Sequence, residues 1–352
     1  MEDLTDKGRN AILFAILAAL FYGVSSPLSK LLLVKIPPTF LAALLYLGAG
    51  LGMSLVNLTR RASARQSEAP ITAKELPYVG GMILLDIAAP ILLMFGLTLT
   101  TPANVSLLNN FEIVATALIA LFLFREPIGR RMWLAIGLIT LSSLILSFED
   151  ASSLSFSTGS LLVLLASLCW GFENNFTRKL SIKDPLQIVV IKGIGSGLGA
   201  LLIAIFTHEL SVNWIYIVLA MLLGFFAYGL SIYFYIRAQR DLGAARTSAY
   251  YAVAPFIGVG LSMLVYRQPI TLAFASALAT MLLGTYFTVF ERHSHLHTHE
   301  VLTHEHRHHH DDGHHNHTHD YPVTEHSHVH THEALTHAHV HTPDVHHQHS
   351  HQ

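Results

Sequence analysis

Ten apolar runs separated by short polar segments dominate the first 290 residues of the chain. Each run is about twenty residues long, which is enough for a helix to cross the hydrocarbon core of a bilayer. A backbone in lipid has to satisfy its own hydrogen bonds, so the pattern predicts an all-α membrane protein. The expected spans are 11–34, 39–58, 77–99, 103–124, 130–148, 159–179, 185–207, 213–236, 245–266 and 270–290.

One stretch occurs twice. Residues 103–128 align with residues 245–270 at a shift of 142 positions, and the aligned segments end in REPI (125–128) and RQPI (267–270). A repeat of this length is too long for a solenoid, and it suits a duplicated membrane module. We therefore expect two copies of one helical unit.

A second match supports the duplication. Tyr22-Gly23 corresponds to Trp170-Gly171 at a shift of 148 positions. We expect an N-terminal segment (1–10), a first five-helix half (11–148), an acidic, Ser-rich loop (149–158), a second five-helix half (159–291) and a C-terminal tail (292–352).

Lysine and arginine predict the orientation. With the N-terminus in the cytoplasm, fifteen of these residues fall in cytoplasmic segments and only Lys30, Lys35 and Arg267 fall outside. This bias satisfies the positive-inside rule. Because each half holds an odd number of spans, the halves are expected to insert in opposite directions, with both chain termini in the cytoplasm.

Composition excludes several classes of protein. Hydrophobic residues make up 52% of the 352 positions and charged residues 12%, whereas soluble domains carry about 25% charged residues. The net charge of −2 gives no sign of a nucleic-acid partner. The sequence has no P-loop, CxxC or HExxH motif, so we predict neither an enzyme nor a self-contained ATP-driven pump.

Ionisable residues within spans are the strongest candidates for function, because each costs roughly 2.5–3.5 kcal/mol at the centre of a helix on insertion scales. They are Asp86, Glu112, Glu173 and Lys192. Polar or aromatic neighbours complete the candidate substrate or coupling site, namely Asn109, Asn110, Asn174, Tyr22, Trp170, Tyr250 and Tyr251. We expect these side chains to face a cavity formed mainly by the first, fourth, sixth and ninth spans.

Each charged candidate also has a structural interpretation. Glu112 could carry protons or bind a cationic substrate, or it could be tied to Lys192 or to an asparagine. Asp86 could cap amides near a proline kink, and Glu173 could pair with Arg178. Lys192 could extend to the membrane interface, as long basic side chains do.

Glycines gather in the second and seventh spans. Gly48 and Gly52 in one, and Gly193 and Gly197 in the other, have the G-x-x-x-G spacing that lets helix backbones approach closely. We interpret them as packing positions rather than as a gating hinge.

The tail has a different composition, with 24 of the 25 histidines between positions 293 and 351. It has little apolar material to bury, so we expect a disordered cytoplasmic segment. Imidazole binds zinc, nickel, cobalt and copper, which makes the tail a candidate metal-binding segment, although no cofactor is required. Its candidate ligands are His293, His295, His297, His299, His308, His309, His310, His314, His315, His317 and His319. Alternatively, the tail is a solvated segment whose charge varies with pH.

The duplicated segments, the span count and the topology together resemble the EamA type of the drug/metabolite transporter superfamily. The resemblance covers both halves and omits the tail. The second copy keeps a proline, Pro255, halfway along, whereas the first copy has Ile113 beside Glu112. The closing acidic position is kept as Glu126 and becomes Gln268. The resemblance implies inverted five-helix repeats around a central cavity and secondary transport, usually export, of small polar metabolites.

The sequence thus favours a transporter in the cytoplasmic membrane that exports a small polar, amino-acid-like or drug-like solute. An alternative is an exporter of a divalent transition metal or a metal–chelator complex, with the tail collecting the ion. Another alternative is a membrane sensor of metal or pH that transports nothing.

Overall fold

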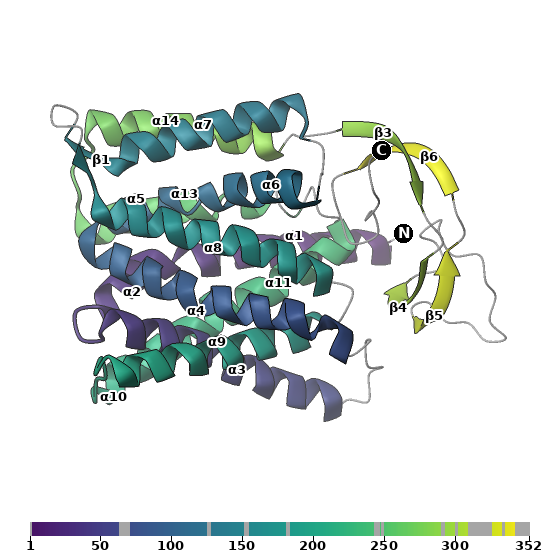
Figure 1. Ribbon diagram of the computed structural model, residues 1–352, viewed down its shortest axis with the longest axis horizontal. Coiled ribbons are helices and arrows are strands. Elements are labelled where there is room, and N and C mark those ends of the chain that lie inside the picture. The colour runs from purple at the N-terminus through teal and green to yellow at the C-terminus, as the bar shows by residue number, and fades with distance from the viewer. Residues whose placement is uncertain are drawn as a thin grey trace.

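A computed structural model of the protein shows a bundle of long helices that run side by side, with the tail strands beyond one end (Figure 1). The structure describes residues 2–62, 71–124, 128–150, 155–180, 184–242, 247, 250–289, 293–299, 302–308, 326–332 and 335–341. No side chain beyond residue 289 is described.

The first half of the chain contains α1 to α7. The bounds are α1 (Glu2–Gly23), α2 (Ser25–Leu32), α3 (Pro38–Ala62), the 3₁₀ turn η1 (Ala73–Glu75), α4 (Leu76–Leu99), α5 (Pro102–Leu108), α6 (Phe111–Phe124) and α7 (Arg130–Ser147). The short pair β1 (Phe148–Asp150) and β2 (Ser155–Phe156) then leads to the second half.

The second half contains α8 to α14. The bounds are α8 (Thr158–Leu180), α9 (Pro185–Phe206), α10 (Trp214–Gly224), the π-helix η2 (Phe225–Leu230), α11 (Ser231–Leu242), α13 (Ala254–Tyr266) and α14 (Leu272–Val289). Among the described residues, eight helices are long and apolar enough to span a membrane, and α13 is a shorter apolar one. α8 is not among the eight; it carries the polar sequence Glu173-Asn174-Asn175 near its end.

Local sequence sets where several helices begin. Proline occupies the first turn of α5 and α9, where its missing N–H costs no hydrogen bond. Thr101 and Asp184 cap these helices by accepting hydrogen bonds from the Asn104 and Leu186 backbone amides. Pro90 lies inside α4, yet the helix continues through it.

Two spans contain breaks that correspond between the halves. The fourth span turns at Asn109 and Asn110, where α5 gives way to α6. The ninth span turns at Ala252 and Val253, immediately before α13. A shift of 142 residues brings the first turn to within one residue of the second (109 + 142 = 251), so the duplication includes the break as well as the helices.

Helix packing follows an approximate twofold relation. α8 of the second half packs against α4 and α6 of the first, and α1 of the first half packs against α11 and α13 of the second. The related pairs α3·α9, α7·α14 and α5·α13 each join the halves. α6 ends on the same side as the start of α1, whereas α13 ends on the opposite side (Figure 1). The halves therefore run in opposite directions, as expected for inverted repeats.

Close glycine contacts repeat the same relation at single residues. A Cβ on Gly171 would lie 2.6 Å from Ala115 Cβ, and one on Gly23 would lie 2.9 Å from Ile257 Cβ. Gly23 and Gly171 differ by 148 positions, and Ala115 and Ile257 differ by 142. The shift of 148 relates the two glycines and the shift of 142 relates their partners, so the same helix–helix contact occurs once in each repeat.

The glycines of the second and seventh spans pack as predicted. A Cβ on Gly193 would lie 2.4 Å from the backbone N of Gly50, and one on Gly50 would lie 2.5 Å from the N of Ile194. Real Cβ atoms do not approach backbone this closely, so α3 and α9 touch where only glycine fits.

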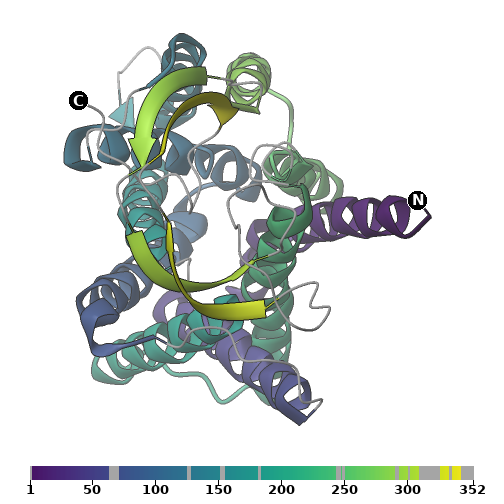
Figure 2. The same cartoon turned by 90° about the vertical axis from the view of Figure 1, so that its right-hand side faces the viewer.

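The described part of the tail consists of four strand segments. They are β3 (His293–His299), β4 (Leu302–His308), β5 (His326–His332) and β6 (Leu335–His341). β3 pairs with β6, and β4 pairs with β5, both antiparallel. Figure 2 shows these strands seen from their end of the bundle. Histidine occupies every second position along most of each segment, a period of two that is typical of strands and that composition alone does not reveal.

Candidate functional site

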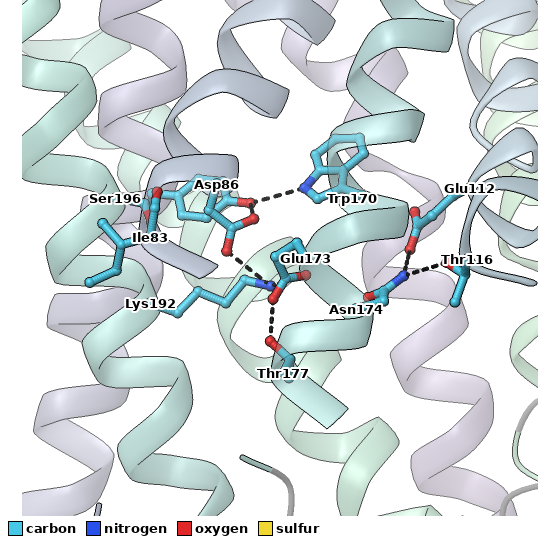
Figure 3. A network of polar contacts seen from close by, with 11 residues as sticks. Ile83, Asp86, Glu112, Thr116, Trp170, Glu173, Asn174, Thr177, Lys192 and Ser196 are labelled. Carbon is cyan, nitrogen blue, oxygen red and sulfur yellow. Dashed lines mark hydrogen bonds and ion pairs between the residues drawn. The ribbon is translucent and has the colours of Figure 1, made fainter. Parts of the chain in front are cut away.

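Three charged side chains meet inside the bundle, each from a different helix (Figure 3). The ammonium Nζ of Lys192 on α9 lies 3.1 Å from Asp86 Oδ2 on α4 and 3.0 Å from Glu173 Oε2 on α8. The side chains of Asp86 and Glu173 are buried, and that of Lys192 is 13% exposed. We call Asp86, Glu173 and Lys192 the charged cluster.

Hydroxyl groups hold both carboxylates of the charged cluster. The Tyr46 hydroxyl on α3 donates a hydrogen bond to Asp86 Oδ1 at 2.9 Å. The Trp170 indole on α8 in turn donates to the Tyr46 oxygen at 3.4 Å. The Thr177 hydroxyl, one turn further along α8, donates to Glu173 Oε1. Each carboxylate therefore contacts a hydroxyl group through one oxygen and the Lys192 ammonium through the other.

Glu112 lies on α6, beside the charged cluster. Its Oε1 accepts a hydrogen bond of 2.6 Å from the Asn174 side-chain amide, which also lies 3.2 Å from the Thr116 hydroxyl (Figure 3). The next residue, Asn175, donates to the Thr116 carbonyl at 3.2 Å. The Glu112 side chain is only partly buried. Asn174 thus positions one carboxylate oxygen.

Aromatic rings lie on the other side of Glu112. The carboxylate interacts electrostatically with the phenols of Tyr22, Tyr228 and Tyr251. The ring centroid of Tyr22 is 5.8 Å from that of Tyr251 and 6.3 Å from that of Tyr228. Tyr228, in the π-helix η2, accepts a hydrogen bond from the Ser25 hydroxyl at 3.0 Å. A carboxylate beside electron-rich rings is suited to a cation.

The remaining predicted site residues take different positions. Asn109 and Asn110 are buried at the break between α5 and α6, where Asn109 Oδ1 and Asn110 Nδ2 have no hydrogen-bond partner among the described residues. Tyr250 is partly buried just before the corresponding break. All three therefore lie at breaks.

Several structural interpretations of the charged residues are corrected. Asp86 does not cap helix amides, because its oxygens contact Tyr46 and Lys192. Lys192 does not extend to an interface, because two buried carboxylates surround its ammonium. Glu173 pairs with Lys192, and the proposed pairing with Arg178 falls on a side chain outside the described residues. The asparagine alternative for Glu112 is the one observed.

Asp86 and Lys192 lie on the third and seventh spans, as the sequence places them, and Glu173 lies on the sixth. The charged cluster therefore shares only the sixth span with the cavity that we expected mainly among the first, fourth, sixth and ninth spans. Sequence reasoning also missed Tyr46, Thr116 and Thr177. A hydroxyl within an apolar run is a signal for such residues, but it is too common to identify one in advance.

The metal prediction is not tested by the described side chains. Among them, no group of three or more His, Cys, Asp or Glu is placed to hold a metal ion. His293, His295, His297 and His299 lie along β3, and His308 ends β4, with only their backbone described. The other candidate ligands lie outside the described residues: His309, His310, His314, His315, His317 and His319.

Known proteins show the same architecture. Residues 9–148 and 157–290 each match the EamA-like transporter family. An uncharacterized transporter of Methanothermobacter thermautotrophicus is 27% identical over 289 residues, covering 77% of this chain and 83% of that one. The uncharacterized transporter YyaM of Bacillus subtilis is 23% identical over 184 residues, covering 49% of this chain and 60% of that one.

A solved crystal structure has the same fold. It superposes with a TM-score of 0.57 at 18% sequence identity, covering 80% of this chain and 98% of that one. This likeness concerns the fold alone, whereas the family match covers both halves of the chain. The protein belongs to the EamA-like transporter family.

Proposed function

We propose that the protein is a secondary transporter that exports a small polar solute by alternating access between its inverted repeats. The observation that carries this proposal is the charged cluster within membrane-spanning helices, where Asp86 of one repeat meets Glu173 and Lys192 of the other. Family membership supports transport and argues against an enzyme.

Energetics support a functional origin for these charges. Each buried ion costs several kcal/mol of desolvation, and a well-packed apolar replacement is often as stable or more stable. The surrounding helices could supply such packing, since they bury leucines, methionines and alanines throughout. Charges retained at this depth are therefore better explained by transport than by stability.

Glu112 is the residue that we assign to solute recognition. One of its oxygens is held by Asn174, its side chain is partly exposed, and the rings of Tyr22 and Tyr251 lie near it. A carboxylate and aromatic faces together favour an ammonium group by charge and by cation–π attraction. The favoured solute is amino-acid-like or drug-like and carries an amine.

Orientation supports export. In Figure 1, the start of α1 and the tail strands lie at the same end of the bundle. The lysine and arginine bias assigns that end to the cytoplasm. In this orientation the tail would lie on the side from which an exporter takes its solute.

The test is a flux measurement on the full-length protein in liposomes. The liposomes are loaded with a defined mixture of amino acids, nucleosides and quaternary ammonium compounds, and efflux is quantified by mass spectrometry. We expect at least one compound with an amine to leave faster than from protein-free liposomes.

A substitution identifies the role of Glu112. Glu112→Gln should slow that efflux about tenfold or more, because the ammonium group of the bound solute would lose its ionic partner. Ser142→Ala is the matched control, because Ser142 also makes a buried hydrogen bond, to the Ala277 carbonyl on α14, away from the site. If no compound moves, or if Glu112→Gln matches Ser142→Ala, the assignment is wrong.

A further inference from the structure

The charged cluster contains one more acid than base. Two carboxylates, Asp86 and Glu173, share the single ammonium of Lys192 at 3.1 and 3.0 Å. With all three groups ionised the cluster carries a net charge of −1 at a depth where an uncompensated charge is costly. A purely structural ion pair needs only one carboxylate. The second carboxylate is therefore a site where one proton can balance the charge.

Each carboxylate is anchored within its own repeat. Tyr46 and Asp86 both belong to the first half of the chain, and the hydroxyl of one donates to the carboxylate of the other. Thr177 and Glu173 belong to the second half, on the same helix. Lys192 also belongs to the second half, so its contact with Asp86 crosses between repeats and its contact with Glu173 does not.

The backbone around Lys192 keeps the ammonium between the two acids. The neighbouring residue, Gly193, touches Gly50 on α3 so closely that a Cβ would lie 2.4 Å from its nitrogen. One turn later, the Ser196 hydroxyl donates to the Ile83 carbonyl on α4 at 3.3 Å. In this arrangement of the repeats these contacts hold Lys192 between the two acids, so the location of the proton decides with which acid the ammonium pairs.

We infer that the charged cluster holds one exchangeable proton, and that its location on Asp86 or on Glu173 determines whether Lys192 links the two repeats. This role rests on the proposed transport function and extends it, because it assigns proton coupling to the cluster and solute recognition to Glu112. With the proton on Glu173, Lys192 pairs with Asp86 across the repeats. With the proton on Asp86, Lys192 pairs with Glu173 within one repeat, and the link is released.

The proton balance is simple. A proton enters from water on one side and bonds to a carboxylate oxygen of the cluster, while Lys192 stays an ammonium ion. After the repeats move, the proton leaves to water on the other side, and the carboxylate regains its negative charge. Each cycle therefore carries one proton.

Few other titratable groups face this site. Among the described residues they come from three neighbouring elements: Tyr46 from α3, Glu112 from α6 and Tyr228 from η2. In the described part of the chain Glu112 is the one further acid beside the cluster, so the Glu112→Gln background removes its carboxyl signal before the proton on the cluster is observed.

Infrared difference spectroscopy of the full-length protein in liposomes tests the proton directly. Spectra are recorded between about pH 6 and alkaline pH, a range in which exposed carboxyl groups, with a usual pKa of about 4, stay ionised; they are taken in H₂O and D₂O, in the Glu112→Gln variant. We expect one protonated carboxyl band. Asp86→Asn and Glu173→Gln should each abolish it, since either leaves one carboxylate for one ammonium. Ser196→Ala, which changes the same α4·α9 interface without changing charge, should keep it.

Two outcomes would overturn the inference. One is the absence of a pH-dependent carboxyl band in the Glu112→Gln protein. The other is a band of unchanged amplitude in both Asp86→Asn and Glu173→Gln, with circular dichroism confirming that the variants are folded. Two variants on different helices keep the test decisive if one fails to fold.

A transport measurement separates this inference from the proposed function. With a solute identified in the efflux screen, wild-type liposomes should accumulate it about tenfold or more when a pH gradient is imposed. Asp86→Asn should lose that accumulation yet still exchange labelled for unlabelled solute. If wild type moves no solute, the proposed function fails while the infrared result stands. If Asp86→Asn accumulates solute like wild type, the inference fails and transport stands.

Discussion

The charged cluster has a neutral counterpart at the repeat-related position. A shift of 142 residues relates Asp86 to Tyr228 (86 + 142 = 228), and a shift of 148 relates Ser25 to Glu173 (25 + 148 = 173). In one place, Asp86 and Glu173 share a lysine. In the other, the Ser25 hydroxyl donates to the Tyr228 oxygen at 3.0 Å. The same inter-repeat contact is therefore ionic in one copy and neutral in the other.

This difference shows that duplication determines which helices meet, but not which side chains occupy the contact. Both contacts join the helix that opens one repeat to the third span of the other repeat, as inverted insertion requires. The geometry is thus common, while the chemistry has diverged. Of the two contacts, only the ionic one has a group that can bind a proton or a charged solute near neutral pH. The neutral contact therefore serves the packing of the repeats, and the ionic contact serves function.

The largest effect should come from removing the one base of the ionic contact. Lys192→Met leaves two carboxylates without a cation, and breaking a buried pair in this way costs about 3–5 kcal/mol. SDS titration of helix content in mixed micelles would measure the loss. A cost below about 1 kcal/mol, as typical of an exposed pair, would contradict burial of the cluster.

Making the ionic contact neutral should reverse most of that loss. In the triple variant Lys192→Met, Asp86→Asn, Glu173→Gln no buried charge remains, and neutral replacements of buried ion pairs are often neutral or stabilising by about 1–4 kcal/mol. The same titration should therefore find the triple variant more stable than Lys192→Met alone. If it is less stable, the cluster holds the fold together and the comparison fails.

The backbone contacts common to both repeats should respond alike. Gly23→Ala and Gly171→Ala each place a Cβ about as close to its neighbour, 2.6 Å from the Ala254 oxygen and 2.6 Å from Ala115 Cβ. Overpacking of this kind costs roughly 1–3 kcal/mol, so the two melting temperatures in detergent should fall by similar amounts.

Gly137→Ala is the matched control for this pair, since nothing lies within 4 Å of a Cβ there. It should melt close to wild type. If only one of Gly23→Ala and Gly171→Ala destabilises the protein, the repeats are not equivalent in packing.

Sequence reasoning identified the elements and most of the charged residues, but not their partners. The spans, the duplication and the use of the glycines of α3 and α9 for close helix packing follow from periodicity and spacing, which are local properties. The pairing of Lys192 with Asp86 joins residues 106 positions apart (192 − 86 = 106), and which helices become neighbours depends on packing. Tyr46 could not be selected for the same reason, since it becomes important only once α3 lies against α4.

The breaks and the tail show a second limit. Asn109-Asn110 and Ala252-Val253 turn at closely related positions although their side chains differ, so composition alone did not reveal them. In the described part of the tail, the alternation of histidine has the period of a strand, which composition does not show. Metal binding by these histidines stays a prediction from their chemistry.

The smallest effect should distinguish the two phenols next to the compared contacts. Tyr46 donates to a carboxylate, and such hydrogen bonds contribute about 1.5–3 kcal/mol. Tyr228 accepts from the neutral Ser25 hydroxyl, a kind of bond that contributes about 0.5–1.5 kcal/mol. Tyr46→Phe should therefore lower the free energy of unfolding more than Tyr228→Phe, in the same SDS titration. Both substitutions delete one oxygen from a buried ring, so each is the control for the other. Equal losses would mean that Asp86 carries no charge in the folded protein, and the contrast between the ionic and the neutral contact would not hold.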